Sequence, residues 1–247
     1  MIEPTDRRGA LRRGMIAIAA LGVGGLALGG CSSSSSSSRK GNLPTARWPD
    51  QASSRPPSRR WEPLPETSTP SSGGYSGELI PRSDWARGQP VPALMDRADR
   101  PYNAITLHHD GMDAFTSTNR SAAAARIEKI RAAHRSRNFG DIGYHYLIDP
   151  AGRVWCGRDL YWQGAHVKGQ NPGRLGVCLM GNYSVQRPNQ AQLEALSRFT
   201  TSQMRRYGIP VSQVQTHMEL AQTECPGRNL QPMLVSMRRN GGTLARA

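Results

Sequence analysis

A histidine and a cysteine stand eight residues apart near the end of the chain, and this pair most limits what the chain can build. His217 closes a short β-like run, and Cys225 precedes Pro226-Gly227, which stops regular structure and forces a turn. A neutral imidazole and a thiolate are ligands of the kind that zinc takes. Because two ligands do not hold a catalytic metal, a third is expected elsewhere in the sequence.

The strongest candidate for the third ligand is one of two adjacent histidines, His108 and His109, at the end of another β-like run. Adjacent strand residues point to opposite faces, so we expect only one of them to reach the metal. One of them with His217 and Cys225 would form a His₂Cys set and leave a fourth tetrahedral position open, as in catalytic zinc sites. Taken alone, the spacing also fits an ordinary strand histidine and an inert buried cysteine.

The first thirty residues have the pattern of an export signal. Two arginine pairs precede an apolar, Gly- and Ala-rich run from residue 15 to residue 30, which ends at Cys31. The run is shorter than the roughly 20 apolar residues that span a membrane. Residues 28–31, Leu-Gly-Gly-Cys, resemble the lipobox of bacterial lipoproteins, in which the cysteine is lipidated. The arginine pairs resemble a twin-arginine signal without its usual aromatic residue, so the export route stays open.

Residues 31–78 are predicted to form a disordered tether behind the lipidated cysteine. Cys31 is followed by seven consecutive serines, and the segment continues rich in Pro, Ser and Arg, with few apolar residues to bury. Ser32, rather than Asp, after the cysteine resembles the signal for outer-membrane sorting. We therefore expect a cell-envelope protein, lipid-anchored at Cys31 in the outer membrane and facing the periplasm.

Residues 79–247 have the length of one domain, and that domain is basic. It carries 22 Lys and Arg against 12 Asp and Glu, a net charge of +10 out of +14 for the whole chain. Such a charge suggests an anionic partner such as nucleic acid, acidic lipid or a wall polymer, or simply a well-solvated surface. The export signal and the lack of a recognised binding motif argue against nucleic acid as the partner.

Strand-like and helix-like runs alternate along this domain. Strands are predicted at 103–108, 143–148, 153–156, 175–181 and 211–217, and helices at 119–135, 190–207 and 231–239. The first helix is expected to be capped by one of residues 116–118, with His134 on its surface. The apolar run at 175–181 is expected to be central in the sheet. The alternation predicts an α/β fold, a single domain with a central mixed β-sheet flanked by helices.

Seven short motifs follow one another in order between residues 80 and 235. They are Arg82-Ser83-x-Trp85, Leu107-His108-His109, Gly143-Tyr144-His145-Tyr146, Gly157-Arg158, Gly164-Ala165-His166, the run from Asn171 to Asn182, and Thr223-Glu224-Cys225-Pro226-Gly227. The ordered set resembles the zinc-dependent N-acetylmuramoyl-L-alanine amidases of the peptidoglycan-recognition-protein type, a family that includes phage lysozyme-like amidases. The resemblance covers almost the whole domain.

The resemblance implies a set of site residues. The family's zinc ligands fall on His108, His217 and Cys225, and its catalytic tyrosine falls on Tyr144. A further catalytic position, lysine in some members and threonine in others, is Thr223 here. The family often continues its second ligand as His-Arg-Asp, whereas His217 is followed by Met-Glu, so a carboxylate contact to this ligand is not implied.

Other motif residues receive weaker assignments. Trp162, His166 and Asn171 are predicted to line the substrate groove, although a structural loop role for His166 is equally open. His145 is expected to face the core, and His109 either to face the core or to support a metal ligand. Cys156 and Cys178 lie on predicted strands, where disulfide geometry is restrictive, so we expect no bridge between them even in an oxidising compartment.

The activity implied by the resemblance is hydrolysis of the amide bond between N-acetylmuramic acid and L-alanine in peptidoglycan, in wall turnover or remodelling. Zinc would lower the pKa of a bound water and polarise the carbonyl. The expected partners are muropeptides and, through the anchor at Cys31, a membrane. The alternative is a non-catalytic peptidoglycan-binding lipoprotein, because some family members lose the cysteine ligand; the presence of Cys225 favours the enzyme.

Overall fold

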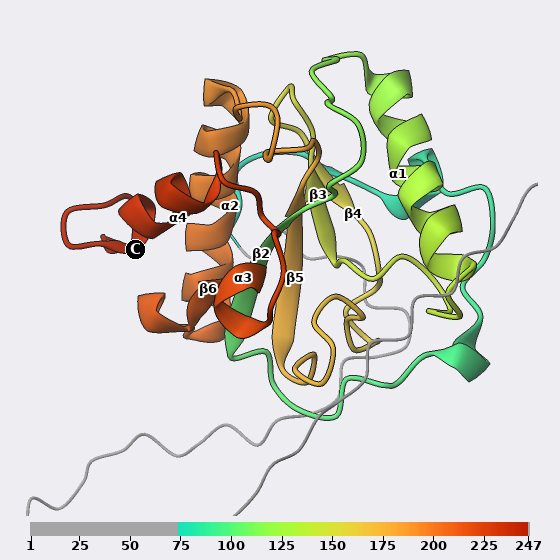
Figure 1. Ribbon diagram of the computed structural model, residues 1–247. Helices are drawn as coiled ribbons and strands as arrows, with labels where there is room; N and C mark the ends of the chain where they lie inside the picture. The colour runs from blue at the N-terminus through green and yellow to red at the C-terminus, as the bar shows by residue number, and fades with distance from the viewer. Residues whose placement is uncertain (1–73, 247) are drawn as a thin grey trace, which may run out of the picture. The chain divides into compact units, whose positions relative to one another are not determined.

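A mixed six-stranded sheet forms the centre of the computed structural model, which describes residues 74–246 (Figure 1). The strands are β1 (Leu79–Ile80), β2 (Ala104–His109), β3 (Tyr146–Ile148), β4 (Val154–Cys156), β5 (Arg174–Leu179) and β6 (Val214–Thr216). Their spatial order is β1-β4-β3-β5-β2-β6, and every neighbouring pair is parallel except β3 and β4. The predicted mixed sheet is confirmed.

Helices cover both faces of this sheet, as Figure 1 shows. One face carries α1 (Arg120–Arg135), and the other carries α2 (Gln190–Tyr207) and α4 (Gln231–Arg238). A four-residue helix, α3 (His217–Leu220), follows β6 directly. Three short 3-10 helices complete the described elements: η1 (Arg82–Asp84), η2 (Pro92–Leu94) and η3 (Val211–Gln213).

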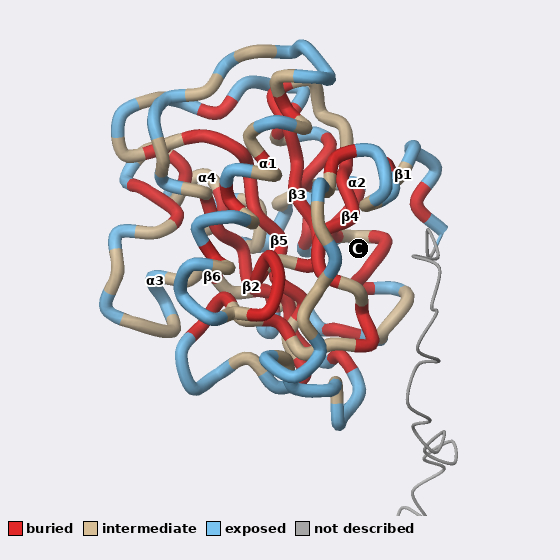
Figure 2. The backbone as a smooth tube through the Cα atoms, turned by 90° about the vertical axis from the view of Figure 1, so that its right-hand side faces the viewer, coloured by how far each residue is buried: buried red, intermediate tan, exposed pale blue. Residues whose placement is uncertain are grey.

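The two sides of β2 serve two separate cores. Ile105 and Leu107 pack in the cluster that contains the inner residues of α2, such as Phe199. Cys178 is the register partner of His108 on β5, and it belongs to the cluster under α1. Because side chains alternate along a strand, His108 projects toward the α1 side of the sheet. Figure 2 shows the strands as the buried centre of the domain.

The start of α1 differs from the sequence prediction. Asn119 caps the helix, because its side chain accepts a hydrogen bond from the backbone N–H of Ala122 at 3.0 Å. None of residues 116–118 holds this position. An Asn cap supplies an acceptor for an otherwise unpaired N–H of the first turn. Asn189 does the same for α2 by accepting from the N–H of Gln192 at 2.9 Å.

The far end of α1 corrects a second expectation. His134 was expected on the helix surface but is buried, and its Nδ1 accepts a hydrogen bond from the backbone N–H of Gly143 at 2.9 Å. It lies on the same inward face as Ile130 and Ile127, which stand four and seven residues earlier in the helix. The helical period, which places these three residues on one face, correctly indicates its burial.

Two predicted strands are shorter by more than one residue in the structure. The run at 211–217 divides into η3, β6 and the start of α3, so His217 is the first residue of a helix rather than the end of a strand. Thr216 and Glu219 form a capping box that begins this helix. The run at 143–148 is extended as a strand only from Tyr146, which leaves Tyr144 in the preceding loop.

Residues 1–73 lie outside the described part of the chain, and with them the predicted export signal, Cys31 and most of the predicted tether. Tyr75, upstream of the predicted domain start at residue 79, is buried and packs edge-on against Phe199, with ring centroids 5.4 Å apart. The packed domain therefore includes Tyr75. No helix among the described residues is long and apolar enough to cross a membrane.

His145 has the core role that was expected of it. Its Nδ1 accepts from the backbone N–H of Gly176 at 3.0 Å, and its Nε2–H donates to the carbonyl of Trp162 at 3.2 Å. The side chain thus ties the loop before β3 to the middle of β5. Burial lowers the pKa of His145 to about 3, because a charged imidazole cannot be solvated there.

We expect this histidine to make the fold acid-sensitive. The unfolded chain takes up the proton near pH 6.5, whereas the folded chain resists it to about pH 3, so stability falls as the pH drops through this window. One such group costs about 1.4 kcal/mol per pH unit. In chelator, urea unfolding of His145→Asn should show a shallower loss between pH 6 and pH 4 than the wild type. Parallel curves for the two proteins would contradict this account.

Candidate metal centre

The parallel pairing of β2 with β6 places two histidines side by side. The register matches Leu107 with Thr216, so the residues that follow them, His108 on β2 and His217 at the start of α3, lie together at the same edge of the sheet. Their ring centroids are 4.7 Å apart. Carboxyl ends of parallel strands meet at one edge, which is where ligand sites of α/β sheets are generally found. His108 is fully buried in the sheet and His217 is half-buried at the start of α3.

Cys225 reaches the same edge on the loop that follows α3. The loop turns at Gly227, whose positive φ of 95° and close approach to the backbone of Tyr183 leave no room for a side chain. Within the loop, the N–H of Cys225 donates to Oγ1 of Thr223 at 3.2 Å. The backbone N–H of His109 donates to Sγ of Cys225 at 3.4 Å and so fixes the sulfur beside β2.

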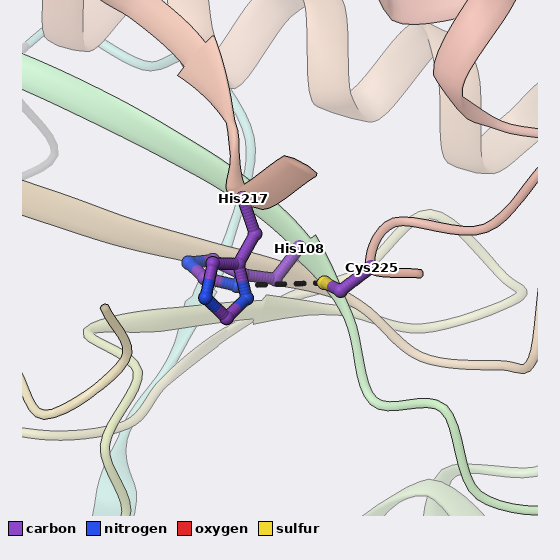
Figure 3. Close-up of side chains that lie close together, drawn as sticks. All are labelled: His108, His217 and Cys225. Atoms are coloured by element: carbon purple, nitrogen blue, oxygen red, sulfur yellow. Dashed lines mark hydrogen bonds between the residues drawn. The ribbon is translucent and has the colours of Figure 1, made fainter. Parts of the chain in front are cut away.

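The three side chains converge on one point, as Figure 3 shows. The Nδ1 atom of His108 and the Sγ atom of Cys225 are 3.6 Å apart, and the ligand atoms of His108, His217 and Cys225 all lie within 4.8 Å of one another. Two ligands of a tetrahedral zinc ion, at about 2.1 Å for nitrogen and about 2.3 Å for sulfur, are themselves roughly 3.6 Å apart. The donor set and its spacing therefore fit a metal ion.

The side chain of His109 takes no part in this cluster; only its backbone contacts Cys225. Its Nδ1 accepts a hydrogen bond from the backbone N–H of Tyr183 at 3.2 Å, on the other side of β2. The expected division of the histidine pair, with one member toward the cluster and the other toward the core, is what the structure shows.

A pocket of about 650 Å³ opens beside the cluster. Its walls come from the end of β2, the end of α1 and the loops around residues 144 and 168. The lining residues are Asp110, His134, Arg137, Phe139, Tyr144, Ala165, His166, Val167, Lys168, Gly169, Asn171 and His217. Its volume lies within the range of ordinary small-molecule pockets, about 300–1,000 Å³.

Tyr144 stands between the pocket and the cluster. Its ring centroid is 5.2 Å from that of His108 and 5.4 Å from that of His134. Burial, with a smaller contribution from the nearby sulfur atoms of Cys178 and Cys225, raises the pKa of Tyr144 well above its usual value. The phenol therefore keeps its proton near neutral pH and can act as a hydrogen-bond donor.

Asp110 lines the pocket, but its carboxylate oxygens are already hydrogen-bonded within the protein. Its carboxylate accepts two hydrogen bonds from Arg126, at 2.8 and 2.6 Å, and one each from the backbone N–H groups of Met112 and Gly181, both at 3.0 Å. Four donors occupy its lone pairs, so it is poorly suited to remove a proton from a substrate. Sequence reasoning did not single out Asp110, and its position directly after the histidine pair was the available signal.

Of the three residues predicted to line a substrate groove, two line this pocket and one does not. His166 and Asn171 line the pocket, and the side-chain oxygen of Asn171 accepts from the backbone N–H groups of His166 and Val167. Trp162 is not among the lining residues; its backbone pairs with Arg97. His134 is among them, although the sequence analysis assigned it no site role.

Other predicted site features also have definite positions. The carboxylate of Glu219 accepts from the N–H of Thr216 and pairs with Arg238, so it caps α3 instead of contacting His217. Cys156 and Cys178 are buried, free cysteines in the described structure.

Comparison with known proteins agrees with this geometry. The family described as N-acetylmuramoyl-L-alanine amidase matches residues 98–228, which include the whole cluster. The mouse N-acetylmuramoyl-L-alanine amidase is 31% identical over 159 residues, covering 62% of this chain and 29% of that protein. The chain thus spans less than a third of this mammalian relative. A peptidoglycan-recognition protein of Drosophila simulans is 30% identical over 155 residues, covering 62% of this chain and 84% of that protein.

Solved structures show the same fold. Wild-type Drosophila PGRP-LB superposes with a TM-score of 0.59 at 25% identity, over 65% of this chain and 94% of that one. The amidase LysC of Clostridium intestinale superposes with a TM-score of 0.52 at 25% identity, over 62% of this chain and 91% of that one. Since the family match spans more than half of the sequence and the described sheet, helices and pocket agree with it, this chain belongs to the N-acetylmuramoyl-L-alanine amidase family.

Proposed function

We propose that this protein is a zinc-dependent amidase that cleaves the bond between N-acetylmuramic acid and L-alanine in peptidoglycan, in wall turnover or remodelling. The observation that carries the proposal is the convergence of His108, His217 and Cys225 beside an open pocket. Three protein ligands leave a coordination position free, which distinguishes catalytic zinc sites from closed structural ones. A protein that only recognised muropeptides would not need Cys225.

The ionisation of the three side chains suits a metal. Burial lowers the pKa of both His108 and His217, so both imidazoles are neutral near pH 7 and keep a lone pair for coordination. Burial raises the pKa of the Cys225 thiol to about 12, so its proton has to leave when a metal binds. Zinc, when bound there, would supply Lewis-acid polarisation of the amide carbonyl and a water of lowered pKa.

The protein's own groups would orient the substrate. Tyr144 keeps its proton and faces the pocket, so it would donate a hydrogen bond to the oxygen that becomes negative as the amide is attacked. Thr223 would act through the loop, because its hydroxyl oxygen already accepts from the N–H of Cys225. Asp110 is saturated by its four donors, and we assign it no proton-transfer role.

The charges around the pocket favour an anionic substrate. Arg137 and Lys168 are exposed cations in its lining, while Asp110, its one acid, is paired with Arg126. The stem peptides of peptidoglycan carry carboxylates that such cations attract. Among the relatives, a mutant of Drosophila PGRP-LB and the PGRP-LCa–PGRP-LCx complex were each solved with tracheal cytotoxin bound. This supports muropeptides as the ligand class here.

The first test is incubation of the zinc-loaded domain with purified muropeptides, followed by mass spectrometry. We expect free stem peptide and intact glycan, with the activity lost in chelator and restored by zinc. Cys225→Ala should lose both bound zinc and cleavage, because two ligands do not hold the ion. Cys156→Ala, a matched loss of a buried free cysteine outside the cluster, should keep both. Tight muropeptide binding by a zinc-loaded protein without cleavage would indicate a binding module instead.

Tyr144→Phe tests the proposed hydrogen-bond donor. Removing one such donor should lower kcat by about 10²–10³-fold with zinc content unchanged. The matched control is Tyr146→Phe, two residues along, because the hydroxyl of Tyr146 is buried without a partner in the described structure. Steady-state kinetics on a defined muropeptide would measure both variants. Equal kcat for Tyr144→Phe and the wild type would remove Tyr144 from the mechanism.

We also propose that the protein is a lipoprotein of the bacterial cell envelope, anchored at Cys31 in the outer membrane and facing the periplasm. The support is the lipobox-like sequence at residues 28–31 and the Ser/Pro-rich segment after it. Cells expressing the full chain should incorporate an alkyne fatty acid into the wild type and Cys156→Ala but not into Cys31→Ala. Equal labelling of Cys31→Ala would contradict the anchor, and density fractionation would identify the membrane.

A further inference from the structure

His166 makes more defined contacts than a groove-lining residue needs. Its Nδ1 lies 3.0 Å from Nε2 of His108, and its Nε2 lies 3.4 Å from the carbonyl oxygen of Arg174. Its backbone N–H donates to the side-chain oxygen of Asn171 at 2.9 Å. The side chain is buried and both ring nitrogens have protein partners.

These contacts determine which nitrogen carries the proton in each ring. A carbonyl only accepts, so Nε2 of His166 must be the N–H that donates to Arg174. A neutral imidazole has one N–H, which leaves Nδ1 of His166 as an acceptor. His108 must then donate from its own Nε2, and its Nδ1 keeps the lone pair. That nitrogen is the one 3.6 Å from Sγ of Cys225, on the side of the metal cluster.

We propose that His166 is the positioning residue of this metal centre. It holds His108 in the Nε2–H tautomer, so that the lone pair of Nδ1 is directed toward the ion. Hydrogen bonds of this kind orient metal-bound histidines and make them better ligands. The usual acceptor in such pairs is a carboxylate or a carbonyl; here it is a second imidazole, whose own orientation is set by the carbonyl of Arg174. His166 would act through His108 and would not itself bind the metal.

Two glycines make room for the ring of His166. A Cβ atom on Gly164 would lie 2.5 Å from Cδ2 of His166, and a Cβ on Gly176 would lie 2.5 Å from the same atom. Real Cβ contacts do not come this close, so any other residue at either position would displace the ring. Gly176 belongs to β5, so a central strand of the sheet forms one wall of the site. The imidazole is therefore fixed by packing as well as by hydrogen bonds.

The inference rests on the proposed metal site but needs no catalysis, so its test uses metal affinity and protonation. Asn and Leu have similar shapes, but only Asn offers a side-chain oxygen near the place of Nδ1. We expect His166→Leu to bind zinc about 10–100-fold more weakly than the wild type, measured by competition with a chelator. His166→Asn should recover most of that loss. His145→Asn, a change in a buried histidine with no hydrogen bond to His108, should leave zinc affinity unchanged.

Equal zinc affinities for the Asn and Leu variants, whether both weak or both like the wild type, would overturn the proposal. A second measurement requires no variant. Nitrogen-15 NMR of the imidazoles in the metal-free wild type should show His108 and His166 both protonated at Nε2, and protonation of His108 at Nδ1 would overturn the assignment. If these results hold but muropeptides are not cleaved, the amidase proposal fails and the positioning role stands.

Discussion

The parallel pairing of β2 with β6 is the constraint on which the site depends. It places His108 and His217 at the same edge of the sheet. The loop after α3 then adds the sulfur of Cys225, which completes the three-ligand cluster. The pairing is held by apolar residues such as Leu107 that have no part in the chemistry. The sheet therefore fixes the ligand positions before any ion binds, so little chain entropy remains to be lost on binding.

The same burial sets the charge state of the centre. The surroundings of β2 exclude water and disfavour charged imidazoles, so the histidines near the pocket are neutral, including His134, whose pKa is lowered to about 4 by burial and by nearby arginines. The one carboxylate in the pocket wall, Asp110, is neutralised by Arg126. Negative charge in the cluster thus comes from the Cys225 thiolate alone, and it forms only as a cation enters.

The sequence predicted the parts of this fold that have strong local patterns. The apolar runs of β2 and β5 and the periodic helices α1 and α2 lie within a few residues of their expected positions. Strand β1 was not predicted, because two residues carry no period. The division of 211–217 depended on the capping box of Thr216 and Glu219, which overrides a β-like composition. The residues alone predicted a His₂Cys set with one histidine of the 108–109 pair, and the choice of His108 came from the family resemblance.

No sequence motif could predict the hydrogen bonds that orient the proposed metal ligands. His145 and His166 both contact Gly176, one through its backbone N–H and the other through the space that a side chain would fill. One glycine on β5 thus serves both a structural histidine and the proposed partner of a metal ligand. Such a position has no chemistry of its own to mark it in a sequence. The need for glycine at position 176 becomes evident only when the sheet brings residues 108, 145, 166 and 176 together. A side chain there would lie within van der Waals distance of the neighbouring ring.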